Sequence, residues 1–482
     1  MDIPLISSIY VEKLFGLYSY KLPDDGELTN ASILYGDNGV GKSTILRLVF
    51  HLLSAAGDRG HRNALYNAPF GRIEVLLESG ILLAASREVS DEGDFYEGLN
   101  KGLVLTIHKG ADLLGEWVFD PEKRNKSEYF VHDDTELRIS GADTFAHEWA
   151  SNIKRNVKVV KSDFKLGFSS LDVHSKQSYL NALAKHAPTM FILNADRRLD
   201  CDAVSDPSDE VELRRVMRFE EPKRINDLVV RSREIALSQA LSSAAKWVSA
   251  KALQSVNLGA ENVHTVYVNV LKHLVSPSSA KGLEVAPQTE DLLKLIAEIE
   301  NKTAELSVYD LAAPLSLVEF RKALSAKAKP KRALAAGLLK PYIDSLKGRI
   351  EAVIPIYTVL HRFIKIINDF LTDKTIEYKV SGGFKILSAH DGTPLEARHL
   401  SSGEQQLLLL LCYVLTGRDK ACVFMIDEPE ISLNIKWQRK LVRTLLEITE
   451  GANIQFVFAS HSIELLAQHK DRVIKLVNKN AQ

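Results

Sequence analysis

The chain has 482 residues, of which 45% are hydrophobic and 26% charged, and its 61 Lys and Arg nearly balance its 62 Asp and Glu. This is ordinary globular composition, and the length suits two or three domains. The formal net charge of −1 argues against a protein that binds polyanions through its overall charge, although a local basic patch is compatible with it. Three scattered cysteines, Cys201, Cys412 and Cys422, are too few for a disulfide framework or a zinc site.

The apolar segments are too short for a membrane protein. The longest apolar run, Leu407 to Leu415, is about half of the roughly 20 residues that a membrane span needs. No basic segment precedes an apolar stretch at the N-terminus, so we expect no signal peptide. The sequence therefore predicts a soluble, cytoplasmic protein without membrane contact.

Strand signals dominate the N-terminal part of the chain. Aromatic and β-branched residues fill Ile9–Tyr20, and the short apolar run Ala31–Tyr35 precedes the glycine-rich segment 36–41 and the helical segment Ser43–Leu53. Further strand candidates are Gly71–Leu83, Leu103–Phe119 and Thr189–Leu193.

Helical spacing replaces the strand signals from about residue 209 to about residue 371. The helical runs, which prolines separate, are Glu210–Phe219, Asp227–Leu253, Val263–Leu274, Thr289–Leu306 and Ala333–Phe370. Strand signals return at Ile376–Leu387, Ala421–Ile426 and Asn453–Ala459. We therefore predict an α/β protein in which 1–205 and 373–482 are the two halves of one domain. Residues 206–372 form a helical insertion between them, with room for a short coiled-coil hairpin.

Residues 36–43 read Gly-Asp-Asn-Gly-Val-Gly-Lys-Ser, a complete P-loop pattern between a strand and a helix. Its glycines let backbone N–H groups turn inward toward phosphate oxygens at a helix N-terminus. Lys42 would reach the β- and γ-phosphates, and Ser43 would be a ligand of Mg²⁺. The expected nucleotide-binding residues are Gly36, Asn38, Gly39, Gly41, Lys42, Ser43 and Thr44.

Paired carboxylates follow a buried strand at Asp427 and Glu428. In such a pair one carboxylate can face Mg²⁺ while the other polarises the attacking water. Acidic residues at a strand end are also common in solvated loops, so the pair indicates a functional role only in combination with the P-loop.

Two further segments complete the pattern. Ser401, Ser402 and Gly403 precede an apolar helix and so predict either a second anion-binding helix N-terminus or an ordinary capped helix. His461 follows the last apolar strand directly. A lone histidine there is usually structural, and only the order of all four segments favours a functional role.

That order resembles the ABC-type ATPases. Two segments are similar in sequence to one soluble branch of these ATPases. They are residues 400–406, Leu-Ser-Ser-Gly-Glu-Gln-Gln, and residues 427–433, Asp-Glu-Pro-Glu-Ile-Ser-Leu. This branch includes SMC and RecF-like DNA-repair ATPases, the OLD family and the ATPases of anti-phage systems such as Septu and PARIS. The resemblance covers about 1–60 and 370–465 and implies an ABC-type P-loop head, a mixed sheet with flanking helices, that carries a long helical insertion.

The resemblance implies a cofactor, ATP with Mg²⁺, and a role for each matching residue. Lys42, Ser43 and Asp427 would hold Mg-ATP, with Ser43 and Asp427 as the metal ligands. Glu428 would be the general base, and His461 would contact the γ-phosphate. Lys42, Glu428 and His461 are thus the catalytic candidates.

The resemblance also implies that Ser401 and Gly403 close on ATP bound by a second subunit, in a homodimer or a higher homo-oligomer. One element departs from the family pattern, because no Gln occurs before Gln177 to sense the metal and the γ-phosphate. Asn194, at the end of the Thr189–Leu193 strand, is the candidate substitute. Hydrolysis is then expected to be slow or gated by a partner.

The distance along the chain between Lys42 and Ser401 argues against a transporter, whose nucleotide-binding domain has a much shorter span there. Prolines also break the insertion too often for the extended arms of SMC proteins. OLD enzymes continue into a Toprim nuclease, for which the residues after His461 are too few. We therefore expect an ATPase and sensor of an anti-phage complex with an effector in trans, a Toprim or HNH nuclease-like protein, and a phage protein as its trigger.

Two alternatives stay open. A RecF-like or SMC-like ATPase acting on DNA would need a basic surface, for which there are two clusters that also read as solvated helix faces: Arg214, Arg215, Arg218, Lys223 and Arg224, and Lys322, Lys327, Lys329, Lys331 and Arg332. A scaffold that binds ATP without turnover is the other alternative. Separately, His51, His61 and Arg62 read either as a cover over the nucleotide or, better, as a solvated loop.

Overall fold

The computed structural model describes residues 5–56, 60–87, 102–121, 129–132, 135–138, 170–194, 199–201, 225–260, 268 and 285–479. The chain folds into two compact units. The first contains residues 1–211, 418–439 and 451–482, and the second contains residues 212–417 and 440–450. The predicted α/β architecture, with a long helical part in the middle of the chain, is confirmed.

An antiparallel sheet of the first unit has the strand order β2-β1-β4-β5-β6-β7. Its strands are β1 (Ile6–Leu14), β2 (Tyr18–Leu22), β4 (Arg72–Leu77), β5 (Ile81–Ser86), β6 (Leu103–Lys109) and β7 (Asp112–Phe119). The two predicted strand regions at 71–83 and 103–119 each become a hairpin, because Gly80 and Gly110 adopt the positive φ that a tight turn needs. A separate two-stranded sheet pairs β8 (Tyr129–His132) with β9 (Thr135–Arg138).

The other six-stranded sheet has the order β11-β10-β15-β16-β3-β17. Its strands are β3 (Ala31–Tyr35), β10 (Thr189–Leu193), β11 (Leu199–Cys201), β15 (Cys422–Asp427), β16 (Ile454–Ala459) and β17 (Val473–Lys475). Only the β10–β11 pair is antiparallel. Every residue of β15 and β16 is buried, as expected for continuous apolar runs in a parallel sheet.

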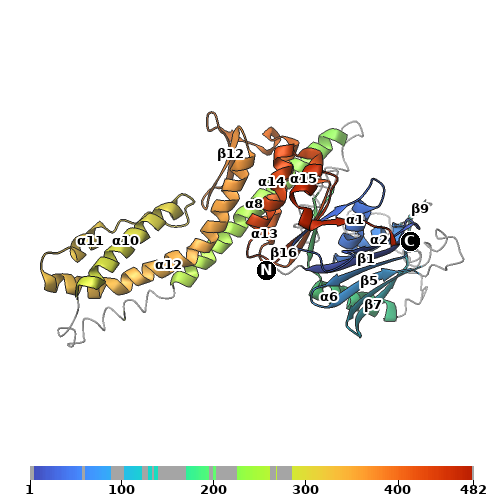
Figure 1. The fold of residues 1–482 in the computed structure, drawn as a ribbon, viewed down its shortest axis with the longest axis horizontal. Helices are drawn as coiled ribbons and strands as arrows, with labels where there is room; N and C mark the ends of the chain where they lie inside the picture. The colour runs from blue at the N-terminus through green and yellow to red at the C-terminus, as the bar shows by residue number, and fades with distance from the viewer. Residues whose placement is uncertain are drawn as a thin grey trace. The chain divides into compact units, whose positions relative to one another are not determined.

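Helices cover both sheets of the first unit (Figure 1). The P-loop helix α1 (Lys42–Leu53) packs against β10, β15 and β16 and also against β5. Helix α6 (Ser170–His186) covers β6 and β7. The short helices are α2 (His61–Asn67), η4 (Pro429–Ser432), α15 (Ile463–Gln468) and η5 (Lys470–Arg472).

The prediction of a solvated loop at His61 and Arg62 is wrong. Both residues belong to α2 and are 6% and 4% exposed. The Arg62 guanidinium donates to the carbonyls of His51 and Ser54, so it satisfies the last turn of α1. Burial, with the nearby charge of Arg62, lowers the pKa of His51 to about 4. These residues therefore stabilise the end of the P-loop helix and do not cover its beginning.

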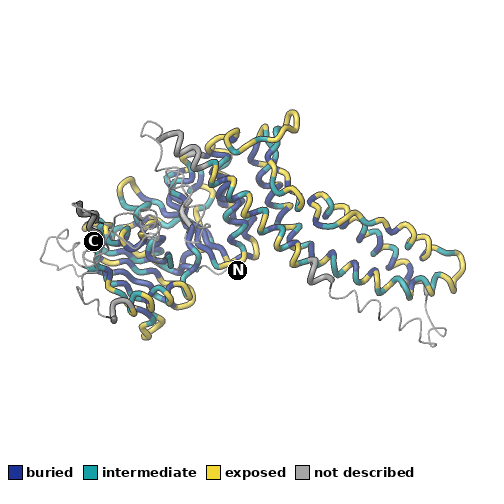
Figure 2. The backbone as a smooth tube through the Cα atoms, turned by 180° about the vertical axis from the view of Figure 1, so that it is seen from behind, coloured by how far each residue is buried: buried dark blue, intermediate teal, exposed yellow. Residues whose placement is uncertain are grey.

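The second unit is mainly helical. It contains α8 (Ile225–Ala260), α10 (Val285–Ser307), α11 (Val318–Leu324), α12 (Lys329–Phe370), α13 (Ser402–Gly417), the short helix η3 (Ala397–His399) and a small sheet of β12 (Lys374–Lys379), β13 (Gly383–Ser388) and β14 (Pro394–Leu395). Helix α12 packs against α8, α10 and α11, and α8 packs against α13. Figure 2 shows buried residues along the helix faces that turn toward one another. Helix α14 (Ile435–Ile448) begins in the first unit and ends in the second.

Two predicted helical runs, 210–219 and 263–274, lie outside the described residues apart from residue 268. Across the ranges that are described, no helix combines the length and the apolar character that a membrane crossing requires.

A buried glutamine joins the two large sheets. Gln455, on β16, is fully buried, and its side chain accepts from the Ile6 backbone N–H at 2.8 Å. Its amide donates to the carbonyls of Ile6 and Thr29 at 3.0 and 3.1 Å. It thus satisfies backbone groups of the N-terminal strand from a position at the other end of the sequence.

We expect Gln455→Leu to lower the free energy of unfolding by about 2–4 kcal/mol, because it leaves these buried backbone groups unsatisfied. The measurement is the thermal or urea unfolding transition of the full chain. Gln468→Leu, at an exposed position of α15, is the control and should change stability by less than about 0.5 kcal/mol. Equal effects of the two substitutions would contradict this role of Gln455.

Candidate nucleotide-binding site

Strand register brings three distant segments to one edge of the parallel sheet. Asp427 pairs with Ala459, and Ala459 pairs with Leu34. Because parallel strands end at a common edge, the segments that follow these residues emerge side by side. They are the P-loop, the Glu428 segment and the His461 segment.

The P-loop runs from Gly36 to the start of α1 at Lys42. Gly41, the N-cap of α1, has φ +95°, and Gly39 has φ +86°. A Cβ atom on Gly41 would lie 2.5 Å from Cδ2 of Leu14, whereas one on Gly39 would meet nothing within 4 Å. Position 41 therefore requires glycine both for its backbone conformation and for its close approach to β1.

Lys42 is 6% exposed and lies across the loop. Its Nζ donates to the carbonyls of Gly36 and Asp37, both at 2.9 Å. Burial lowers the pKa of Lys42, and the charges of Glu428 and Asp427 oppose that shift. The ammonium is thus held beside the glycine-rich backbone and near the two carboxylates.

Ser43 and Asp427 meet although they are far apart in sequence. The Ser43 hydroxyl donates to Oδ1 of Asp427 at 2.8 Å. Asp427 is 2% exposed, and burial raises the pKa of its carboxyl while the bond from Ser43 opposes that rise. A hydroxyl beside a carboxylate is the oxygen donor set that suits Mg²⁺.

The described residues contain no cluster of three or more His, Cys, Asp or Glu that could hold a metal ion. Magnesium in phosphate-binding sites is usually held by one or two protein oxygens, with water and phosphate oxygens as the other ligands. Ser43 and Asp427 fit that pattern.

Glu428 begins a sharp turn at the end of β15. It has φ +47° and ψ +58°, a left-handed conformation that is uncommon for residues other than glycine. Its backbone N–H donates to the Ala459 carbonyl at 2.8 Å. Such local strain is often found at functional sites, where the surrounding structure enforces it.

The His461 segment is held by Glu430. Oε1 of Glu430 accepts from the Ser460 hydroxyl at 2.9 Å and from the backbone N–H groups of His461 and Ser462 at 2.7 and 3.0 Å. The Ser462 hydroxyl also donates to Oε1 of Gln438 at 2.8 Å. The segment between β16 and α15 is therefore fixed by side chains from the segment after β15.

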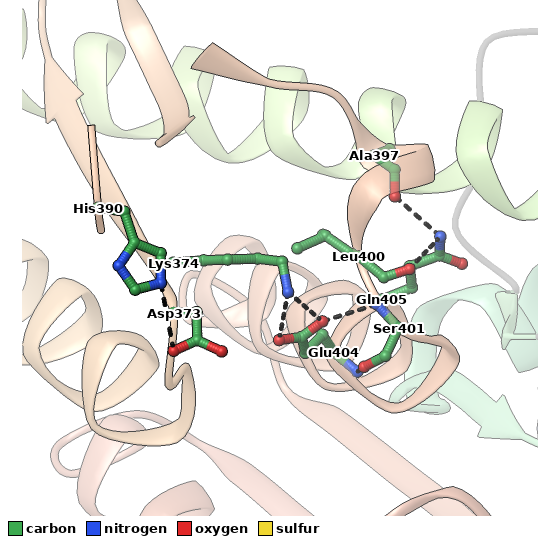
Figure 3. Close-up of polar contacts among 8 residues, drawn as sticks. All are labelled: Asp373, Lys374, His390, Ala397, Leu400, Ser401, Glu404 and Gln405. Carbon is green, nitrogen blue, oxygen red and sulfur yellow. Dashed lines mark hydrogen bonds and ion pairs between the residues drawn. The ribbon is translucent and has the colours of Figure 1, made fainter. Parts of the chain in front are cut away.

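The signature residues Ser401 and Gly403 lie in the second unit, at the N-terminus of α13. The Glu404 carboxylate accepts from the Ser401 backbone N–H at 2.6 Å and from Nζ of Lys374 at 3.1 and 3.2 Å. Figure 3 shows these three residues and their contacts. The Glu404 N–H in turn donates to the Ser401 hydroxyl at 3.3 Å, which completes a capping box. The Gln405 amide donates to the carbonyls of Ala397 and Leu400.

The first unit thus brings the P-loop together with Asp427, Glu428 and His461. Asn194 follows Leu193, which pairs with Ile426, so Asn194 lies at the same sheet edge as Asp427. Ser401 and Ser402 are exposed on the second unit.

Three residues that hold these segments in place, Glu430, Gln438 and Lys374, carry no recognisable signal in the sequence alone. The one exception is that Glu430 is a third acid, three residues after Asp427 and behind a proline. Each of the three has a side-chain or backbone partner 24 to 32 residues away, which a single sequence does not reveal.

Comparison with known proteins gives one family and several relatives. Residues 281–467 match the family described as "AAA domain, putative AbiEii toxin, Type IV TA system". The match is less than half of the chain; it contains Ser401, Asp427, Glu428 and His461, and the P-loop precedes it.

A protein of Clostridium acetobutylicum described as an ABC transporter ATP-binding protein is 27% identical over 111 residues, which are 23% of this chain and 39% of that protein. The molybdenum import ATP-binding protein ModC of Escherichia coli is 34% identical over 79 residues, 16% of this chain and 22% of ModC. The chain therefore spans less than half the length of these curated relatives.

Among solved structures, the Smc head domain with an extended coiled coil from Pyrococcus furiosus aligns with a TM-score of 0.32 and 12% identity, over 96% of this chain and 92% of that one. The Smc head domain with a coiled coil and joint from Pyrococcus yayanosii aligns with a TM-score of 0.33 and 13% identity. That alignment covers 98% of this chain and 95% of the other. The chain is thus similar, over parts of its length, to an AAA-type ATPase family and to ATP-binding proteins of the ABC type.

We expect Gly41→Ala to destabilise the protein more than Gly39→Ala. Both substitutions force alanine into a left-handed conformation, at about 1–2 kcal/mol. Only alanine at 41 also collides with Leu14, which adds about 1–3 kcal/mol. The measurement is the unfolding midpoint of each variant without nucleotide, and equal losses would contradict the close approach of Gly41 to β1.

Proposed function

We propose that this chain binds Mg-ATP at the P-loop and hydrolyses it. The observation that carries the proposal is the contact of Ser43 with Asp427, with Glu428 directly after Asp427 at the same sheet edge. A P-loop without this partner would be a phosphate cradle alone. With it, the residues for binding a metal and for activating water lie together.

Each residue has a distinct task in this proposal. Ser43 and Asp427 would hold Mg²⁺, and the ion would supply positive charge to neutralise the phosphate oxygens. Lys42 supplies a second positive charge beside the backbone N–H groups of the loop. Glu428 accepts the proton of the attacking water, and His461 contacts the γ-phosphate. Asn194 orients the water or the metal from the neighbouring strand end.

Completion of the site by a second subunit is the next element of the proposal. Ser401 is exposed at the N-terminus of α13, where backbone N–H groups and the helix dipole favour an anion. Ser401 and Gly403 of one subunit close on the ATP of another. ATP then stabilises the assembled form, and hydrolysis releases it, because only the assembled form makes these contacts.

For the biological role, we propose an ATPase and sensor in an anti-phage complex that controls an effector protein in trans. Three features support it: the family match over residues 281–467, the signature sequence at 400–406, and the helical insertion in the middle of the chain. A nuclease-like effector and a phage protein as trigger belong to this proposal.

Glu428→Gln should lower kcat for ATP hydrolysis by about 10²- to 10⁴-fold, because the amide cannot accept the proton of water. ATP binding should persist, and native mass measurements should find the variant in its assembled form when ATP is present. Lys42→Ala is the matched control and should lose ATP binding itself. Hydrolysis by the Glu428→Gln variant at the parental rate would contradict the general-base assignment.

A DNA-acting ATPase is the second candidate, because the turn between α11 and α12 carries a basic surface, in which Arg321 and Lys322 are paired with Glu300 and Glu319. Residues 320–343 hold seven Lys and Arg and no Asp or Glu. They span the turn from α11 to α12, where Lys327, Lys329 and Lys331 are exposed and form no ion pair with any described residue. The aromatic rings of Phe320 and Tyr342 stack beside it. The other basic cluster, 214–224, lies outside the described residues.

If this surface binds a nucleic-acid backbone, the triple variant Lys327→Gln, Lys329→Gln and Lys331→Gln should bind duplex DNA more weakly. The slope of log affinity against log salt should also become shallower by about 0.9 per lost phosphate contact. The control removes three other exposed lysines of the same unit, Lys365, Lys379 and Lys385. Fluorescence anisotropy across a salt series measures the DNA affinity and its salt dependence for both triple variants. Equal losses of affinity in the two variants would contradict a specific DNA-binding surface at 320–343.

A further inference from the structure

We propose that Glu430 is a positioning residue that couples the Asp427–Glu428 segment to the His461 segment. This inference rests on the proposed hydrolysis of ATP. It assigns to Glu430 the task of holding His461 in place, not of touching nucleotide.

The contacts of Glu430 are concentrated on one oxygen. Oε1 accepts from three consecutive residues, through the hydroxyl of Ser460 and the backbone N–H groups of His461 and Ser462, at 2.7 to 3.0 Å. Bonds to an ionised acceptor are roughly twice as strong as bonds between neutral groups. The conformation of the His461 segment therefore depends on one carboxylate from another part of the chain.

Local support reaches only part of the His461 segment. The Ser460 hydroxyl oxygen accepts from the Ser462 N–H at 3.0 Å, whereas the His461 N–H donates to Glu430. Strand β16 ends at Ala459, so its ladder does not continue to the N–H groups of residues 461 and 462. Ser462 is the N-cap of α15, and its hydroxyl oxygen accepts from the Leu465 backbone N–H at 3.3 Å. Oε2 of Glu430 is buried and has no hydrogen-bond partner among the described residues.

Glu430 is itself tightly linked to the catalytic candidates. It lies in η4, directly after Glu428 and Pro429, and the Glu428 N–H donates to Ala459. The Gln438 amide donates to the carbonyls of Glu430 and Leu433. The ends of β15 and β16 are thus joined on both sides of the proposed base, and a displacement of one segment moves the other.

The test is a double-mutant cycle on ATP hydrolysis by the full chain, with Glu430→Ala, His461→Ala and the double variant. Glu430→Ala should lower kcat by about 10²-fold while KM for ATP stays within about threefold, because a displaced group weakens the transition state and not the P-loop. Glu430→Gln should fall between the parent and Glu430→Ala, since its neutral oxygen accepts the same bonds less strongly.

The double variant should be no slower than His461→Ala, because both changes remove the same contribution. Losses that multiply, or a raised KM with unchanged kcat, would overturn the proposal. If Glu430→Ala does not fold, the same cycle is run with Glu430→Gln.

Glu464→Gln is the matched control, because it neutralises a carboxylate of the same region that makes no bond to the His461 backbone. It should keep the parental kcat. The proposed function is judged separately: hydrolysis by the parent and its loss in Glu428→Gln uphold it, whatever the Glu430 variants do.

Discussion

The in-register pairing of β3, β16 and β15 is the constraint on which the candidate site depends. Leu34, Ala459 and Asp427 lie opposite one another on adjacent strands, so the loops that follow them leave the sheet together. A slip of one residue would turn Asp427 to the other face of the sheet and separate it from Ser43. The fully buried apolar strands prevent such a slip, and α1 packs across the same strands.

Buried charges in the first unit follow from this geometry. Lys42 and Asp427 are each held by bonds to the backbone or to a neighbouring side chain, as buried charges require. The partly buried Glu430 is held by backbone N–H groups in the same way. Their positions match the task of an ATPase, with a cation beside the phosphate loop and an acid beside the Ser43 hydroxyl. The second unit presents Ser401 at a helix N-terminus that Glu404 and Lys374 organise. In the function that we propose, a site shared between two subunits uses both arrangements.

Local patterns in the sequence predicted the elements of this fold well. The strands Ala31–Tyr35 and Thr189–Leu193 have the predicted bounds, because both are short apolar runs between polar residues. Helix α12 begins four residues before the predicted 333–370 segment and continues through two prolines. Long-range partners could not be predicted: the polarity of His61 and Arg62 indicated a solvated loop, yet the end of α1 buries them. The roles of Gln455 and Glu430 depend on strand order in the same way.

We propose that each ATP is held by the P-loop of one subunit and the signature of another. Mixing two inactive variants, Lys42→Ala and Ser401→Arg, tests it directly through ATP turnover. A mixed assembly contains one site with an intact P-loop facing an intact signature, so we expect the mixture to regain turnover that neither variant has alone. A mixture as inactive as its components, although native mass measurements find the mixed assembly, would contradict it.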